Sequence, residues 1–175
     1  HAATGEARCS ADITLAANQI EMAKKAKLSG KKVVGVVFCG RPLALENIEP
    51  YLDAILVAWH GGTRCAHAAA KTIFGEYTPS GKTSVTFVRK TGQIPLYYNI
   101  TSSGRNVDGY YGVEPHTNYI DSLGSPLYPF GYGLSYTEFA YSEPRIVSEQ
   151  DGIFVVGIKE KNVGDCDGKE LAQCY

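Results

Sequence analysis

Two short, uninterrupted apolar runs constrain the fold more than any other feature of this sequence. Val33–Phe38 is a continuous run of mostly β-branched residues, and Ala54–Ala58 is a second apolar run of strand length. Strands that are apolar on both faces are typical of a parallel sheet that helices cover on both sides. We therefore predict that both runs are buried central strands.

Helix-forming segments alternate with these runs. Residues 17–28 are rich in good helix formers and place Ile20, Ala23 and either Lys27 or Leu28 on one face, with Gly30 as the stop. Further along the chain we predict a short helix over 44–52, a helix over 64–74 capped by Thr63, and a third strand over 84–88. This alternation predicts an α/β layered domain with a mostly parallel sheet.

The chain changes character after residue 95. Nine of the twelve tyrosines lie between Tyr97 and Tyr141, among Gly, Pro, Asn and Ser residues. Long irregular segments of this kind are usually functional or connect domains. The last 40 or so residues then predict short strands over 139–147, 152–159 and 169–175, too few for a β-sandwich, which needs about seven.

Composition and charge exclude several functions. The formal net charge is −1, which does not suit a nucleic-acid-binding protein, because such proteins need a basic face. No apolar run approaches the roughly 18–20 residues of a membrane span. The chain begins with His1 and shows no signal peptide, so we expect it to be part of a longer protein whose localisation cannot be read here.

The five cysteines do not indicate a metal centre. They include no Cys-x-x-Cys pair, which argues against structural zinc, and they are too sparse for a disulfide scaffold. His60, Cys65 and His67 lie close in sequence but supply too few ligands for a metal. Gly61 and Gly62 lack the remainder of a phosphate-binding loop. We therefore expect no metal and no cofactor, and we expect Cys39 to be a buried small apolar side chain.

An ordered series of motifs resembles glycoside hydrolase family 3. The motifs are Gly40–Leu43, Ala54–Gly62, Ile73–Lys82, Gln93–Tyr98 and Pro126–Tyr136. In this order and spacing they resemble the C-terminal α/β sandwich domain of the bacterial β-glucosidase type. The end of the chain resembles the start of the fibronectin type III-like domain that commonly follows, with Asn162–Gly164 and Gly168–Glu170 as its markers.

The resemblance implies a domain organisation. We expect a three-layer α/β/α sandwich with a mostly parallel sheet over residues 1–125, a connecting strap over 126–137, and a truncated fibronectin type III-like β-sandwich over 138–175. The family's first domain is a barrel that carries the catalytic aspartate nucleophile, and nothing in this chain matches it. That barrel is therefore the expected partner domain.

The resemblance also implies an activity, namely hydrolysis of a β-glucoside or β-linked oligosaccharide by a retaining exo-acting β-glycosidase. In many members a Ser-Gly-Glu loop supplies the general acid/base, and Thr4-Gly5-Glu6 stands at that place, which identifies Glu6 as the candidate. Two features depart from the pattern. Arg8 would favour the ionised form of Glu6 if it came close, and Ser10 stands where relatives commonly carry arginine.

These departures, together with those around Arg64, keep a second hypothesis open: a carbohydrate-binding or scaffolding segment whose catalytic role has decayed. Other residues have competing interpretations. Tyr97, Tyr98, Tyr110 and Tyr111 are candidate surfaces for stacking on a sugar ring, and Tyr110, Tyr111 and His116 are candidates for a loop near a substrate mouth. We expect Trp59 to pack in the core, Arg41 to bond to nearby carbonyls, and Asp108 and Asp121 to be turn residues. Tyr128, Tyr132 and Tyr136 are expected to form a packed strap with locally bonded hydroxyls.

Overall fold

The computed structural model describes residues 7–99, 106–107, 116–117 and 119–175. The chain divides into two compact units, each made of separate stretches of sequence. The first unit contains residues 1–69 and 83–132, and the second contains residues 70–82 and 133–175. In the described residues no helix is long and apolar enough to cross a membrane.

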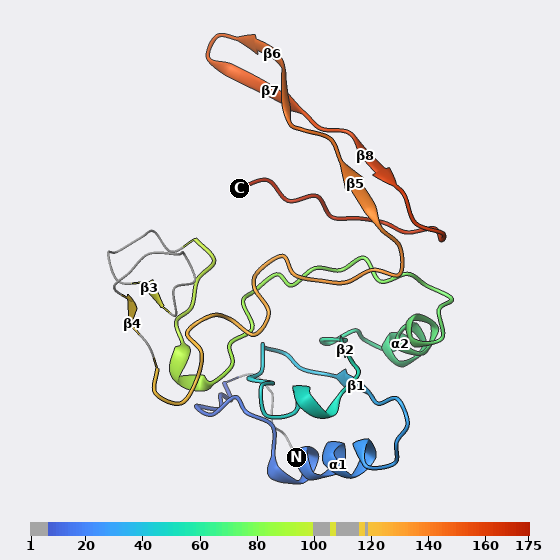
Figure 1. The fold of residues 1–175 in the computed structure, drawn as a ribbon, viewed down its shortest axis with the longest axis vertical. Helices are drawn as coiled ribbons and strands as arrows, with labels where there is room; N and C mark the ends of the chain where they lie inside the picture. The colour runs from blue at the N-terminus through green and yellow to red at the C-terminus, as the bar shows by residue number, and fades with distance from the viewer. Residues whose placement is uncertain (1–6, 100–105, 108–115, 118) are drawn as a thin grey trace. The chain divides into compact units, whose positions relative to one another are not determined.

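The first unit contains the predicted helix–strand alternation (Figure 1). Helix α1 spans Ala17–Lys27, strand β1 spans Val34–Val37, and strand β2 spans Ala54–Val57. The two strands pair in parallel, with Val34 opposite Ala54 and Val37 opposite Val57. The predicted helix over 44–52 is reduced to a short 3-10 helix, η1, at Glu49–Tyr51. Helix α2 spans Cys65–Ile73, of which residues 65–69 belong to the first unit.

The prediction that β1 and β2 are buried on both faces is wrong. Side chains alternate between the two faces of a strand, and the face that carries Val37, Ile55 and Val57 packs against the buried cluster of Ala23, Leu45, Ile48 and Phe87. On the other face Val34 is 42% exposed, and neither Val34 nor Val36 packs against that cluster. Core packing therefore covers one face of this sheet, and the three-layer sandwich remains a prediction.

Gly35 of strand β1 lies next to the side chain of Leu52. A Cβ atom on Gly35 would lie 2.7 Å from Cδ1 of Leu52, so the missing side chain makes room for Leu52. On α1, Ala23 is buried and Lys27 binds Asp53, whereas Leu28 is 85% exposed. Lys27 and not Leu28 therefore completes the helix face that meets the rest of the unit.

The predicted third strand over 84–88 does not form. Its backbone makes a single antiparallel bridge, between Phe87 and Tyr128, instead of joining the β1–β2 sheet. The Phe87 N–H donates to the Tyr128 carbonyl at 2.8 Å, and the Leu127 N–H donates to the Phe87 carbonyl at 2.9 Å. The apolar residues of this segment serve the core, because Phe87 is fully buried and Val88 is nearly so.

Two further short strands are described, β3 at Asn106–Val107 and β4 at His116–Thr117, which pair in parallel. The second unit contains antiparallel strands: β5 (Phe139–Tyr141) pairs with β8 (Glu160–Asn162), and β6 (Arg145–Gln150) pairs with β7 (Ile153–Gly157). The sequence over 139–147 is thus split between two strands. The predicted strand over 169–175 is absent.

The two-residue turn between β6 and β7 explains why this hairpin forms. Asp151 and Gly152 both have positive φ angles, 52° and 77°. Two consecutive residues of this kind make the turn whose twist matches that of the flanking strands, and Asp-Gly is a preferred pair for it.

Side chains of the loop after α2 hold the end of the chain within the second unit. Lys82 forms an ion pair with Glu170 at 3.1 Å, with 14% and 10% of the two side chains exposed. The Thr78 hydroxyl donates to the Asp167 carbonyl at 2.7 Å, and the Tyr136 hydroxyl donates to the Thr72 carbonyl at 2.8 Å. The irregular tail is therefore fixed by side chains instead of by a strand ladder.

Candidate functional site

Glu6, the candidate proton donor, lies outside the described residues, but the backbone that follows it is described. Ala7 has a positive φ of 58°, an uncommon conformation for a residue with a Cβ atom. We refer to residues 7–14 as the N-terminal arm. The contacts of this arm show which residues hold the backbone that follows Glu6.

Arg41 makes the first contact to the N-terminal arm. One guanidinium nitrogen donates to the Arg8 carbonyl at 3.4 Å, and another donates to the Cys9 Sγ at 3.2 Å. This confirms the prediction that Arg41 bonds to a nearby carbonyl. Arg41 lies shortly after the carboxyl end of β1, which is the edge of a parallel sheet where ligand sites usually form.

A second set of contacts holds the end of the arm. The Thr91 hydroxyl donates to the Asp12 carboxylate at 3.2 Å and accepts the Ile13 N–H at 3.3 Å. The Ala44 N–H donates to the Ile13 carbonyl at 3.1 Å, and Ile13 is buried with Ala44 and Val88. The Thr14 N–H, which donates to Asp12, is the main cause that lowers the pKa of that carboxyl.

The loops after β1 and β2 come together at the same edge of the sheet. A Cβ atom on Gly40 would collide with Nε2 of His60, so the imidazole occupies the space beside Gly40. Trp59, the residue before His60, packs against the core and lies 5.8 Å from the Phe87 ring, as predicted. Cys65 donates to the Ala58 carbonyl at 3.5 Å. In the described part of the chain, no group of three His, Cys, Asp or Glu side chains is placed to hold a metal.

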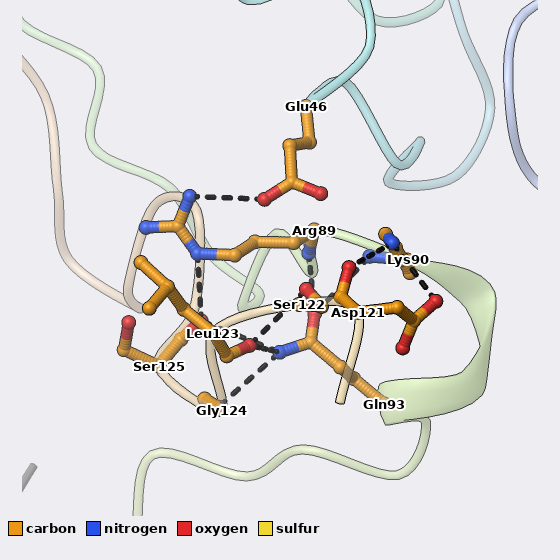
Figure 2. Close-up of polar contacts among 9 residues, drawn as sticks. All are labelled: Glu46, Arg89, Lys90, Gln93, Asp121, Ser122, Leu123, Gly124 and Ser125. Carbon is orange, nitrogen blue, oxygen red and sulfur yellow. Dashed lines mark hydrogen bonds and ion pairs between the residues drawn. The ribbon is translucent and has the colours of Figure 1, made fainter. Parts of the chain in front are cut away.

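A second polar cluster surrounds Gln93, on the short 3-10 helix η2 (Thr91–Gln93), and it was not predicted (Figure 2). Gln93 is 5% exposed. Its side-chain oxygen accepts the N–H groups of Arg89 at 2.6 Å and Lys90 at 3.1 Å. Its side-chain nitrogen lies within hydrogen-bond distance of three successive carbonyl oxygens, those of Leu123, Gly124 and Ser125.

The charged neighbours of Gln93 complete this cluster. Arg89 donates to the Ser125 carbonyl at 3.1 Å and to Glu46 at 3.4 Å. Lys90 forms an ion pair with Asp121 at 3.0 Å, which holds the pKa of Asp121 below its usual value. Asp121 is therefore an ion-paired carboxylate in a bend, which agrees with its interpretation as a turn residue. The cluster joins residues 89–93 to residues 121–125.

The aromatic candidates have mixed outcomes. Tyr98 is 53% exposed and stacks on Phe130, with ring centres 4.4 Å apart. Tyr128 packs against the core and stacks on Tyr132 at 5.2 Å. Asp108, Tyr110 and Tyr111 lie outside the described residues, and the side chain of His116 is not described.

Sequence reasoning thus interpreted Arg41 as a structural arginine and missed the contacts of Thr91 and Gln93. The Gln-Ile-Pro sequence contributed to the family resemblance, but its glutamine carried no signal of its own. A lone glutamine is usually exposed. The hydrogen-bond partners of Gln93 at residues 123–125 lie too far along the chain to be inferred from its neighbours.

Comparison with known proteins identifies the family. The family model described as the glycosyl hydrolase family 3 C-terminal domain matches residues 1–136. The chain is 38% identical over 173 residues to a periplasmic beta-glucosidase of Salmonella typhimurium, covering 97% of this chain and 23% of that protein. It is 35% identical over 182 residues to a beta-xylosidase of Formosa agariphila, covering 100% of this chain and 24% of that protein.

The fold comparison agrees. The crystal structure of a beta-glucosidase from Listeria innocua in complex with glucose superposes with a TM-score of 0.82 at 36% identity, covering 95% of this chain and 24% of that chain. The chain thus spans about a quarter of the length of the relatives it matches. With its fold and most of its length matched, the chain belongs to glycosyl hydrolase family 3 and contains the C-terminal domain of that family.

Proposed function

We propose that this chain is the acid/base-bearing part of a retaining, exo-acting β-glycosidase, a β-glucosidase, with Glu6 as the proton donor. The observation that carries the proposal is the match of residues 1–136 to the family's C-terminal domain. Relatives at 35–38% identity are named as a beta-glucosidase and a beta-xylosidase. The proposal includes a nucleophilic aspartate from an N-terminal barrel, a strap over 126–137 and the start of a fibronectin type III-like domain over 138–175.

The proposed reaction has two steps. The barrel carboxylate attacks the anomeric carbon while Glu6 gives its proton to the departing glycosidic oxygen, which forms a glycosyl–enzyme ester and releases the alcohol. Glu6, now a carboxylate, takes a proton from water as the water oxygen attacks the same carbon. This step releases the sugar and restores both carboxyl groups. The anchored backbone after Glu6 supports this role, because acid/base catalysis needs a carboxyl held at a fixed place.

The test is a Glu6→Ala substitution in the full-length protein. General acid/base help contributes roughly 10²- to 10⁴-fold in rate, so turnover of cellobiose or an alkyl β-glucoside should fall by about that factor. An aryl glucoside with an acidic phenol should lose far less in the first step, because its leaving group departs without a proton. Azide should restore turnover by replacing the activated water, and the product should be a glycosyl azide.

A matched control is Glu21→Ala, which removes an exposed carboxylate on α1 that pairs with Lys24. It should leave both substrates unaffected. If Glu6→Ala behaves like Glu21→Ala on good and poor leaving groups, Glu6 is not the proton donor. If the unsubstituted full-length protein hydrolyses neither β-glucosides nor β-xylosides, the decayed, carbohydrate-binding alternative replaces the enzyme proposal.

The β-xylosidase among the relatives supports a second candidate substrate. The ratio of kcat/KM for nitrophenyl β-glucoside and nitrophenyl β-xyloside decides between the two sugars.

A further inference from the structure

We propose that the outward side of α1 and the turn after it form a docking surface for an anionic lipid membrane. The surface comprises residues 22–32, and we refer to it as the lysine patch. The contact in this proposal is with the surface of the bilayer and does not involve crossing it. The proposal goes beyond the proposed function and does not depend on whether the protein is catalytically active.

Positive charge is concentrated in the lysine patch. Of the 17 Lys and Arg residues in the chain, five lie within residues 24–32, a stretch without Asp or Glu: Lys24, Lys25, Lys27, Lys31 and Lys32. Glu21 pairs with one of these lysines at 2.9 Å, and Asp53 pairs with two, at 3.1 and 3.2 Å. Five positive charges and two negative charges leave a local charge of +3, whereas the whole chain carries −1. The patch is therefore a basic face on a chain that is otherwise slightly acidic.

Two lysines of the patch are available to an external anion. Lys25 and Lys31 are exposed, and the described residues contain no ion-pair partner for either side chain. The carboxyl end of a helix carries partial negative charge, which helps to stabilise lysines that gather there. Lys25 and Lys31 can therefore bind an anionic headgroup without breaking a contact within the protein.

Large apolar side chains stand among these lysines. Met22 is 67% exposed and Leu28 is 85% exposed. Residues three apart are neighbours on a helix surface, so Met22, Lys25 and Leu28 follow one another along one side of α1. Leu28 caps the helix with αR backbone angles, which continue the helical path to this residue. The buried Ala23 marks the opposite side of α1, which faces the core.

This combination of side chains favours a lipid surface over other polyanions. A bilayer interface offers anionic headgroups to lysines and an acyl boundary to the apolar side chains between them. Nucleic acids and acidic polysaccharides offer anionic groups only and would leave Met22 and Leu28 in water. Each lysine close to an anionic bilayer strengthens binding about fivefold. A local charge of +3 therefore predicts binding about 10²-fold tighter than to a neutral bilayer.

Sedimentation of the full-length protein with lipid vesicles tests the proposal. One set of vesicles contains phosphatidylcholine alone, and in the other a third of the lipid is phosphatidylglycerol. The protein should bind the acidic vesicles about 10²-fold more tightly in about 0.1 M NaCl. Binding should be lost in about 1 M NaCl, where the Debye length falls from about 10 Å to about 3 Å.

Two variants separate the charged and the apolar parts of the patch. A double variant with Lys25→Gln and Lys31→Gln should bind the acidic vesicles about 25-fold more weakly, because it lacks two charges. Leu28→Ser should bind them about 10-fold more weakly with the same salt dependence, because the loss is apolar. Each variant tests the proposal separately, so the proposal stays testable if thermal melts show that one of them does not fold.

Matched controls come from exposed positions of the second unit. Lys159→Gln with Lys161→Gln removes the same two charges from the chain. Leu134→Ser removes an apolar side chain that is 74% exposed. Both controls should bind the acidic vesicles as the parent protein does.

Each outcome decides the inference. A parent protein that does not bind the acidic vesicles, or binds both kinds of vesicle equally, would overturn it. Patch variants that bind like their controls would show that the attachment lies elsewhere and would also overturn it. Binding to DNA or dextran sulfate as tight as to the vesicles, with no effect of Leu28→Ser, would replace the membrane with a soluble polyanion.

Discussion

Gln93 should be among the most destabilising positions for a polar-to-apolar substitution. Gln93→Leu removes the acceptor of the Arg89 and Lys90 N–H groups and the donor to three carbonyl oxygens (Figure 2). A buried donor left without an acceptor costs about 1–3 kcal/mol. The two N–H groups together would therefore cost about 2–6 kcal/mol of unfolding free energy. Both are only partly buried, so we expect the lower part of this range, about 2–4 kcal/mol.

Hydrogen exchange of residues 84–93 in the full-length protein measures this loss locally. A cost of about 2–4 kcal/mol corresponds to roughly 30- to 900-fold faster exchange where local opening controls it. Gln19→Leu is the matched control, because the Gln19 amide accepts one exposed hydrogen bond, from the Ala16 N–H at 3.3 Å. The reasoning fails if Gln93→Leu accelerates exchange no more in its own segment than Gln19→Leu does around residue 16.

A Gln93→Glu substitution keeps the side-chain acceptor of Gln93 but replaces its side-chain donor with an oxygen. One oxygen would still accept the two N–H groups, but the other would face the carbonyl oxygens of residues 123–125. These oxygens disfavour an ionised carboxyl, so the pKa of the introduced group should be higher in the folded than in the unfolded chain. Stability relative to the parent should be best below about pH 4 and should decline as pH rises through the raised pKa. A pH-independent difference would contradict this.

Two further predictions concern stability. Phe87→Ala should cost about 3–5 kcal/mol in unfolding free energy, because Phe87 is fully buried, whereas Phe74→Ala, at an 84% exposed site, should be nearly neutral in the same urea titration; similar effects would refute the core assignment. Asp53 accepts the Val33 N–H and binds Lys27 and Lys32, and these contacts hold its pKa well below the usual range. The ionised form of Asp53 therefore stabilises the fold above about pH 4. The loss of stability caused by Asp53→Asn should become smaller as the pH falls below that value. Thermal melts in which the difference between Asp53→Asn and the parent protein does not depend on pH would contradict this.

The elements that were predictable from sequence owe their structure to residues near them in the chain. The apolar runs of β1 and β2 and the helix formers of α1 carry their own signal. The 84–88 segment carries the same strand signal, but its backbone partners, Leu127 and Tyr128, lie some 40 residues away and decide the outcome. Local pattern cannot show such partners.

The same distinction applies to the candidate site. Arg41 next to Pro42 indicated a structural arginine. Its partners Arg8 and Cys9 precede α1 in the chain, whereas Arg41 follows it, so the sequence around Arg41 does not reveal them. Glu6 has no local signal, since an exposed glutamate is the ordinary case. Its assignment depends wholly on its place in the family pattern.

The interleaving of the two units has a consequence for how the protein is made. A ribosome completes residues 70–82 well before it reaches their partners in the second unit, which include Asp167 and Glu170. Chains usually fold domain by domain as they emerge, beginning at the N-terminal end. Here Thr78 and Lys82 remain without these partners while residues 83–132, which belong to the first unit, are synthesised. Translation speed and chaperone access over that interval should therefore influence the yield of folded protein.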